Sequence, residues 1–248
     1  MTRILAIASG KGGVGKTFLA ATLGHAIARR GRRCLVFDAD LGLANLDVQL
    51  GIDAPVDLGR VLEGRIPLER AVFRHEETGL DLVVGRSGSG TLAGLPPARL
   101  VALARELHAL APRYDVVLLD LAAGVEPPCR LFARASHGVI VITTEEPTAL
   151  TDAYAFVKVA CDRSRPVMVV ANAVEDRVRG REVYETLARA CERFLAFRLS
   201  YLGAVRRDPR VGEAIRAQKP LLVRHPTSPA AADVEDLAAR LLAPAPRG

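Results

Sequence analysis

The chain has 248 residues, a formal net charge of +6 and 50% hydrophobic residues, which is enough for one large buried core. The hydrophobic residues come in short runs, far below the roughly 20 apolar residues of a transmembrane helix. The four cysteines form no C-x-x-C pair, which argues against a disulfide framework and against a self-contained zinc site. We therefore expect a soluble protein with one domain over residues 1–242 and a disordered tail over residues 243–248.

Short β-branched or leucine-rich runs alternate with helical patterns along the chain, which is typical of βαβ units. The predicted strands lie near residues 3–8, 33–38, 81–84, 115–120, 138–143, 166–171 and 199–203. The predicted helices lie near residues 16–30, 97–110, 149–161, 180–195 and 208–217, with a last helical pattern at 230–242. Runs such as residues 116–119 are apolar on both faces, so we expect an α/β fold with a doubly wound, mainly parallel sheet and helices on both faces. Ligands of such sheets bind beyond the carboxyl ends of the strands.

The first predicted strand leads into a glycine-rich segment, Gly10-Lys11-Gly12-Gly13-Val14-Gly15-Lys16-Thr17. This segment fits the phosphate-loop motif G-x-x-x-x-G-K-[ST] in its required place between a strand and a helix. Glycine lets the backbone N–H groups of residues 12–15 approach phosphates closely. We expect Lys16 to pair with the β- and γ-phosphates and the Thr17 hydroxyl to bind Mg²⁺. The motif predicts a P-loop nucleotide site.

Acidic residues end two other predicted strands. The second strand ends at Asp38 and is followed by Asp40, and the fourth strand ends at Asp120. Carboxylates that face a phosphate loop can hold Mg²⁺ through water or orient an attacking water, whereas a single aspartate can also be a helix cap or a loop residue. The segment from Asp120 to Gly124 is typical of a Walker B strand end together with a second switch, a loop that responds to the γ-phosphate. We expect Asp120 to lie near the metal and the Gly124 N–H to sense the γ-phosphate.

Lys11, the second residue of the loop, narrows the choice among families of P-loop proteins. The run KGGVGKT from Lys11 to Thr17 resembles the deviant Walker A motif of the MinD/ParA family of P-loop ATPases. The resemblance implies an ATP-dependent homodimer in which Lys11 reaches the phosphates of the partner subunit. It also implies that Asp40 orients the attacking water, that Asp38 lies near the metal and that Asn172 contacts the adenine. From the residues alone, Asn172 is equally a turn residue.

Further stretches resemble the FlhG/FleN branch of this family, which regulates flagellar number and placement. They cover residues 39–51 (ADLGLANLDVQLG), 84–89, 143–154 and 211–221. The resemblance implies slow, partner-stimulated ATP hydrolysis and a flagellar partner, either a signal-recognition-type GTPase or a transcription regulator. It also implies a protein that is cytoplasmic, or peripheral at the inner membrane or the cell pole.

Two features depart from the FlhG/FleN pattern. Leu121 and Ala122 stand where relatives commonly have a small hydroxyl residue or glycine, which removes a side-chain hydroxyl from the second switch. The chain also starts at its first strand, without the N-terminal extension by which some of these proteins contact a GTPase. We therefore do not expect an N-terminal segment to stimulate such a partner.

The sequence leaves several alternatives open. A ParA-type ATPase would position DNA or another cargo, and the basic run Arg206, Arg207 and Arg210 is either a solvated face or a contact for DNA or lipid. The helical pattern at 230–242 either packs on the domain or lies on a membrane, although its acidic face suits anionic lipid poorly. A metal-cluster carrier needs bridging cysteines, and only Cys129 lies near the second switch. A catalytically inactive scaffold is disfavoured because the lysines and aspartates named above are all present.

Overall fold

The computed structural model describes residues 2–40, 45–56, 58–85 and 96–243. These residues form an eight-stranded sheet in the order β3-β4-β2-β5-β1-β6-β7-β8. The strands are β1 (Arg3–Ala8), β2 (Cys34–Ala39), β3 (Phe73–His75), β4 (Leu80–Val83), β5 (Val116–Leu121), β6 (Gly138–Thr143), β7 (Val167–Val174) and β8 (Ser200–Arg206). β3 is antiparallel to β4, and every other neighbouring pair is parallel.

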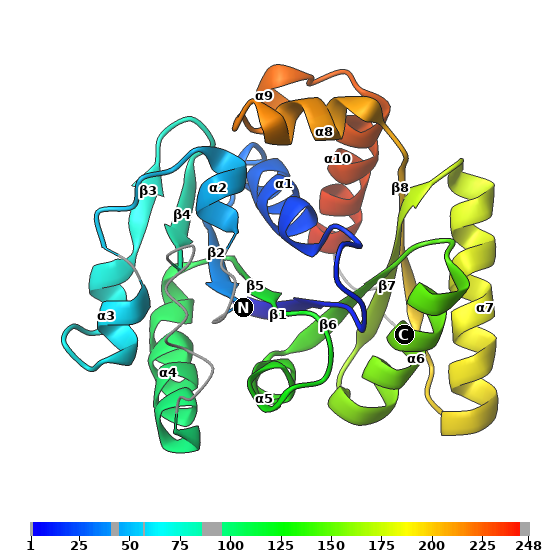
Figure 1. Cartoon of the computed structure of the whole chain (residues 1–248), viewed down its shortest axis with the longest axis horizontal. Coiled ribbons are helices and arrows are strands. Elements are labelled where there is room, and N and C mark those ends of the chain that lie inside the picture. The colour runs from blue at the N-terminus through cyan, green and yellow to red at the C-terminus, as the bar shows by residue number, and fades with distance from the viewer. Residues whose placement is uncertain (1, 41–44, 57, 86–95, 244–248) are drawn as a thin grey trace.

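Helices cover both faces of the sheet (Figure 1). One face carries α1 (Lys16–Ala28), α2 (Leu46–Leu50), α8 (Pro209–Arg216), α9 (Leu221–Arg224) and α10 (Pro229–Leu242). The other carries α3 (Leu58–Leu62), α4 (Pro97–Leu110), α5 (Pro127–Ala135), α6 (Pro147–Ala160) and α7 (Arg177–Leu195), and two 3₁₀ turns lie at Leu68–Ala71 and Ala111–Arg113. The predicted doubly wound α/β fold is therefore confirmed.

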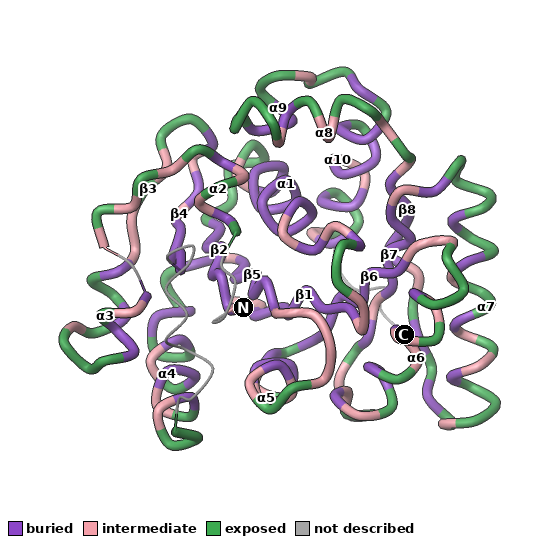
Figure 2. Tube along the Cα trace, in the orientation of Figure 1, coloured by how far each residue is buried: buried purple, intermediate pink, exposed green. Residues whose placement is uncertain are grey.

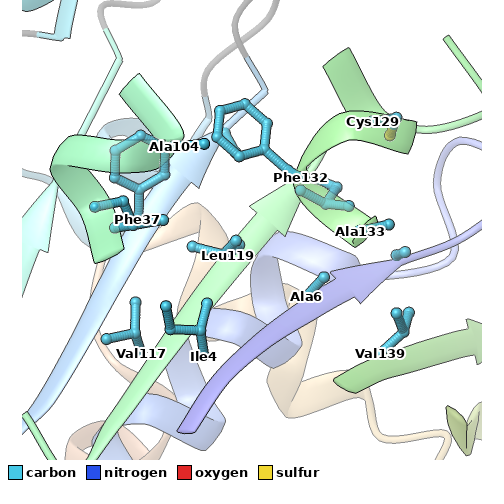
Figure 3. Packing of buried hydrophobic residues seen from close by; sticks show 14 of the residues in the cluster. Ile4, Ala6, Phe37, Ala104, Val117, Leu119, Cys129, Phe132, Ala133 and Val139 are labelled. Carbon is cyan, nitrogen blue, oxygen red and sulfur yellow. The ribbon is translucent and has the colours of Figure 1, made fainter. Parts of the chain in front are cut away.

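The central strands are buried on both faces, as Figure 2 shows by the mainly purple β1 and its neighbours. Side chains alternate across a strand, so Ile4 and Ala6 of β1 pack on the α4–α7 side while Leu5 and Ile7 pack on the α1 side. On the first side, Figure 3 shows Ile4 and Ala6 beside residues of β5 and α5. Dense packing on both sides fixes the ends of β1 and β5, where the predicted chemistry lies.

The predicted strands at 3–8 and 138–143 and the predicted helix at 97–110 match β1, β6 and α4. Several short elements were missing from the prediction, namely α2, α3, α5, α9 and the edge strand β3. Such elements span too few residues for a clear hydrophobic period. α7 begins before the predicted residue 180 because the Asp176 side chain accepts a hydrogen bond from the Arg179 N–H and caps the helix at Arg177.

The last helix packs on the domain through its apolar face. Val234, Leu237 and Leu241 are buried on the side of the sheet that carries α1, so this face is used in packing. Within the described residues, none of the helices combines the length and the apolar character needed to cross a bilayer. Some predicted segments lie outside the described residues. They are the tail beyond Ala243 and the stretches 41–44 and 86–89 of the family resemblance.

One residue of the basic run, Arg206, takes part in an ion pair. The Arg206 guanidinium binds the buried carboxylate of Asp233 on α10, and the Arg206 side chain is 33% exposed. Arg177 at the start of α7 binds the same carboxylate. This ion triad joins α7, the edge strand β8 and α10, and the Arg206 N–H also donates to Asp233. Side-chain bonds of this kind protect the exposed edge of a sheet.

Candidate nucleotide site

The topology brings the predicted site residues to one edge of the sheet. β1 lies between β5 and β6, so the loop after β1 is flanked by the ends of these two strands. Asp120 of β5 is in register with Asp38 of β2. The chain reverses its strand order around β1, which is where doubly wound sheets bind their ligands.

The glycines of the loop fulfil distinct steric requirements. Gly13 and Gly15 have φ values of 78° and 93°, which favour glycine, and Gly15 precedes α1 as its N-cap residue without a side chain. A Cβ at Gly15 would lie 2.4 Å from the Asn172 amide nitrogen. A Cβ at Gly12 or Gly13 would meet nothing within 4 Å, so the described atoms leave open space in front of these residues. The loop therefore forms a cradle that ends at the N-terminus of α1, an arrangement suited to phosphate.

Lys16 is the buried lysine of this loop. Its ammonium Nζ donates to the Ser9 Oγ at 3.0 Å. Burial lowers the pKa of Lys16, and the nearby carboxylate of Asp120 opposes this shift. Lys16 is therefore a cation held inside the site with hydrogen-bond donors to spare.

Lys11 has different surroundings. Its ammonium Nζ lies 2.6 Å from the Glu146 carboxylate and 2.9 Å from the Thr148 hydroxyl, both at the start of α6. The Lys11 side chain is 37% exposed and that of Glu146 is 65% exposed. The hydrogen bond from Lys11 lowers the pKa of Glu146. The loop thus carries one lysine inside the site and a second one at its surface.

Two buried carboxylates face the loop. Burial raises the pKa of Asp38 to about 8, with a further contribution from the charge of Asp120. Burial also raises the pKa of Asp120 to about 7, against a hydrogen bond from Thr17 and the charge of Lys16. A nearby cation stabilises the charged form of a buried acid, which burial by itself disfavours. Among the described residues the buried Asp120 Oδ1 has no hydrogen-bond partner, so it can accept a hydrogen bond from a metal-bound water.

The Asp38 carboxylate accepts hydrogen bonds from three backbone N–H groups of the chain after β2. Its Oδ1 accepts from the Asp40 N–H at 3.1 Å, and its Oδ2 accepts from the N–H groups of Asn45 and Leu46 at 3.3 Å each. Asp38 therefore caps α2 and positions the backbone of Asp40. The negative charge of Asp40 acts to raise the pKa values of Lys16, Asp38 and Asp120, so Asp40 lies at the same site.

Gly124 contacts the residue directly before the loop, and Asn172 contacts the loop itself. The Gly124 N–H donates to the Ser9 carbonyl at 3.0 Å, and Gly124 has a φ of 90°. The Asn172 amide donates to the Val14 carbonyl at 2.7 Å in a buried position. Asn172 is thus more than a turn residue, because it ties the end of β7 to the phosphate loop.

The residues present fit the predicted nucleotide and Mg²⁺. The glycine cradle offers backbone donors for phosphate, and Thr17, Asp38 and Asp120 supply the hydroxyl and carboxylate oxygens that Mg²⁺ prefers. Sequence reasoning missed Ser9, Glu146 and Thr148 as members of the site. Only Ser9 had a local signal, since it directly precedes the loop motif.

A bridging metal cluster lacks comparable support. The Cys129 thiol is buried and donates to the Ala122 carbonyl at 2.9 Å, and burial raises its pKa. Over the described ranges, no three histidine, cysteine or acidic side chains gather as they would to hold a metal ion.

Comparisons with known proteins agree with this geometry. Residues 5–221 match the family described as the CobQ/CobB/MinD/ParA nucleotide binding domain. The chain is 35% identical to the antiactivator FleN of Pseudomonas aeruginosa, over 92% of this chain and 82% of that protein. It is 33% identical to the flagellum site-determining protein YlxH of Helicobacter pylori, over 88% of this chain and 74% of that protein.

Comparison with solved structures supports the same family. The septum site-determining protein MinD of Pyrococcus horikoshii, in complex with Mg-ADP, superposes with a TM-score of 0.84 at 26% identity and covers 98% of this chain and 96% of its own. The resemblance to deviant Walker A ATPases and to the flagellar branch is confirmed. The chain belongs to the CobQ/CobB/MinD/ParA family of nucleotide-binding domains.

Proposed function

We propose that this chain is an ATP-driven switch that dimerises around ATP and Mg²⁺, hydrolyses ATP slowly and regulates flagellar number or placement through a partner protein. The observation that carries the proposal is that the two lysines of the loop lie in different environments. Lys16 is buried inside the site, whereas Lys11 lies at the surface in an exposed ion pair. Exposed ion pairs contribute little to stability, so Lys11 can exchange Glu146 for the phosphates of a second subunit.

The roles of the remaining residues follow from their positions. Bound ATP supplies the phosphoryl group, and Mg²⁺ neutralises charge on its phosphates. Lys16 and the N–H groups of the glycine cradle bind phosphate, while Thr17, Asp38 and Asp120 hold the metal and its waters. Asp40 orients the attacking water. Gly124 exchanges its bond with the Ser9 carbonyl for the γ-phosphate, which couples the second switch to the nucleotide.

Asn172 binds the adenine through the part of its amide that the Val14 carbonyl leaves available. One side chain then contacts the base and the phosphate loop. This arrangement lets base recognition support the shape of the loop.

The flagellar role is supported by the similarity to FleN and YlxH, whose names describe an antiactivator and a flagellum site-determining protein. A transcription regulator or a signal-recognition-type GTPase is the partner that this similarity favours. We place the protein in the cytoplasm, with peripheral association at the inner membrane or the cell pole through its partner.

Light scattering tests the switch. The Asp40→Ala variant, which retains both lysines, should be a dimer with ATP and Mg²⁺ and a monomer with ADP, because blocked hydrolysis preserves the ATP state. Adding Lys11→Ala should return it to a monomer while ATP still binds. A variant that binds ATP and remains monomeric would refute the cross-subunit role of Lys11.

Deletion of the gene tests the cellular role. Flagella counted per cell should change in number or position, and the Lys11→Ala protein should fail to restore them. Unchanged flagella together with mislocalised DNA would instead support a ParA-type function.

A further inference from the structure

Ser9 is the residue on which three parts of the site converge. It directly follows β1 and is 1% exposed. Its hydroxyl accepts from the Lys16 ammonium at 3.0 Å and donates to the Lys11 carbonyl at 2.6 Å. Its own carbonyl accepts from the Gly124 N–H at 3.0 Å. A single buried residue therefore contacts the phosphate-binding lysine, the backbone of the surface lysine and the second switch.

The hydroxyl determines where the Lys16 ammonium lies. An ammonium group has three donors and sits on a flexible four-carbon chain, so its position depends on its hydrogen-bond partners. Among the described residues, the Ser9 Oγ is the acceptor to which Lys16 donates. One donor used on Ser9 fixes the direction of the other two, which are the ones that remain for phosphate oxygens.

The second bond of the hydroxyl fixes the direction of its proton. Because the Ser9 O–H donates to the Lys11 carbonyl, its lone pairs are turned toward Lys16. The same bond holds the backbone of Lys11 at the entrance of the loop. Alanine at position 9 would retain the backbone bond to Gly124 and lose both side-chain bonds.

We propose that Ser9 is a positioning residue for ATP hydrolysis, which aligns the Lys16 ammonium with the transferred phosphate and couples it to the Lys11 segment of the loop. The proposal rests on the ATPase function proposed above. Alignment of a cation matters most in the transition state, where charge on the phosphate oxygens is redistributed. Loss of Ser9 should therefore slow the chemical step more than it weakens nucleotide binding.

Ser136 provides a matched control for a lost buried hydroxyl. Ser136 directly follows α5 and is fully buried, and its hydroxyl donates to the carbonyls of Ala133 and Gly138 at 2.7 and 3.0 Å. Both serines make two side-chain hydrogen bonds, but only Ser9 contacts a residue of the phosphate site. A purely structural role would make the two alanine variants behave alike.

The experiment combines single-turnover ATP hydrolysis with ADP titration on the full chain in Mg²⁺. Ser9→Ala should slow hydrolysis about tenfold and change the Kd for ADP less than about threefold, as expected for loss of one charge-assisted hydrogen bond. Ser9→Thr, which keeps the hydroxyl, should restore most of the rate. Ser136→Ala should leave both values unchanged. Equal rates for Ser9→Ala and wild type, or an equal loss in Ser136→Ala, would overturn the proposal.

A double-mutant cycle with Lys16→Gln tests, by ADP binding and without hydrolysis, whether Ser9 acts through Lys16. The small rise in the Kd for ADP that Ser9→Ala causes in the wild-type background should be absent in the Lys16→Gln background, because the hydroxyl acts through the ammonium. The same fold-change in both backgrounds would show that Ser9 acts independently of Lys16. A wild-type chain that binds ADP without hydrolysing ATP would contradict the ATPase proposal, and the cycle would still test the Ser9–Lys16 coupling.

Discussion

Replacing the buried carboxylate at Asp233 should destabilise the fold through the triad that joins α7, β8 and α10. The Asp233 side chain is inaccessible and accepts hydrogen bonds from Arg177 and Arg206. Breaking a buried ion pair costs about 3–5 kcal/mol when the remaining charge stays buried. Here the two arginine side chains are 52% and 33% exposed, so water can replace part of the lost contact. We expect about 2–3 kcal/mol for Asp233→Asn, which corresponds to a Tm lower by roughly 5–10 °C in a domain of this size.

Thermal unfolding at pH 7 measures this difference, with Asp236→Asn as the control. Asp236 binds the same Arg177 guanidinium at 2.7 Å, but its side chain is 49% exposed, so its loss should cost less than about 1 kcal/mol. Burial would raise the pKa of Asp233, yet the hydrogen bonds from Arg206 and Arg177 hold it below its ordinary value. The stabilisation is therefore present above the unfolded pKa near 4 and is lost as the pH falls through the lower folded value. Equal Tm values for the two variants at pH 7 would refute this account.

Four further variants test other parts of the molecule. Burial lowers the pKa of His25 to about 4, so stability should fall by about 3 kcal/mol between pH 6.5 and 4, and His25→Gln should flatten that dependence in urea titrations. Asn172→Ala should weaken binding of pyrophosphate as well as ADP, because its amide holds the Val14 carbonyl; an effect on ADP alone in calorimetry would assign it only to the base. Gly12→Ala should fold with an unchanged Tm and bind ADP at least about tenfold more weakly, since its Cβ enters the phosphate cradle. Gly15→Ala should also lower the Tm, because position 15 has a positive φ and a Cβ there would meet Asn172.

The lysine pair illustrates why part of the site could be predicted and part could not. Lys11 and Lys16 lie in one continuous motif, so their presence and spacing are visible in the sequence. Their partners are not, because Glu146 is 135 positions from Lys11 and no local period links the two. The same holds for Asn172 and the Val14 carbonyl, which are 158 positions apart. Such contacts depend on the strand order, which places β6 beside β1 and β7 beside β6.

The amino-acid sequence by itself determined the alternation of strands and helices, the phosphate loop and the family, because each is encoded by neighbouring residues or by a short hydrophobic period. The tertiary structure decided the environment of each charge. It buried Asp38 and Asp120 side by side and raised their pKa values, left Lys11 at the surface and moved Arg206 from a predicted basic run into an ion triad with Asp233. These outcomes depend on burial and on distances between segments remote in sequence, and both arise only when the sheet is assembled.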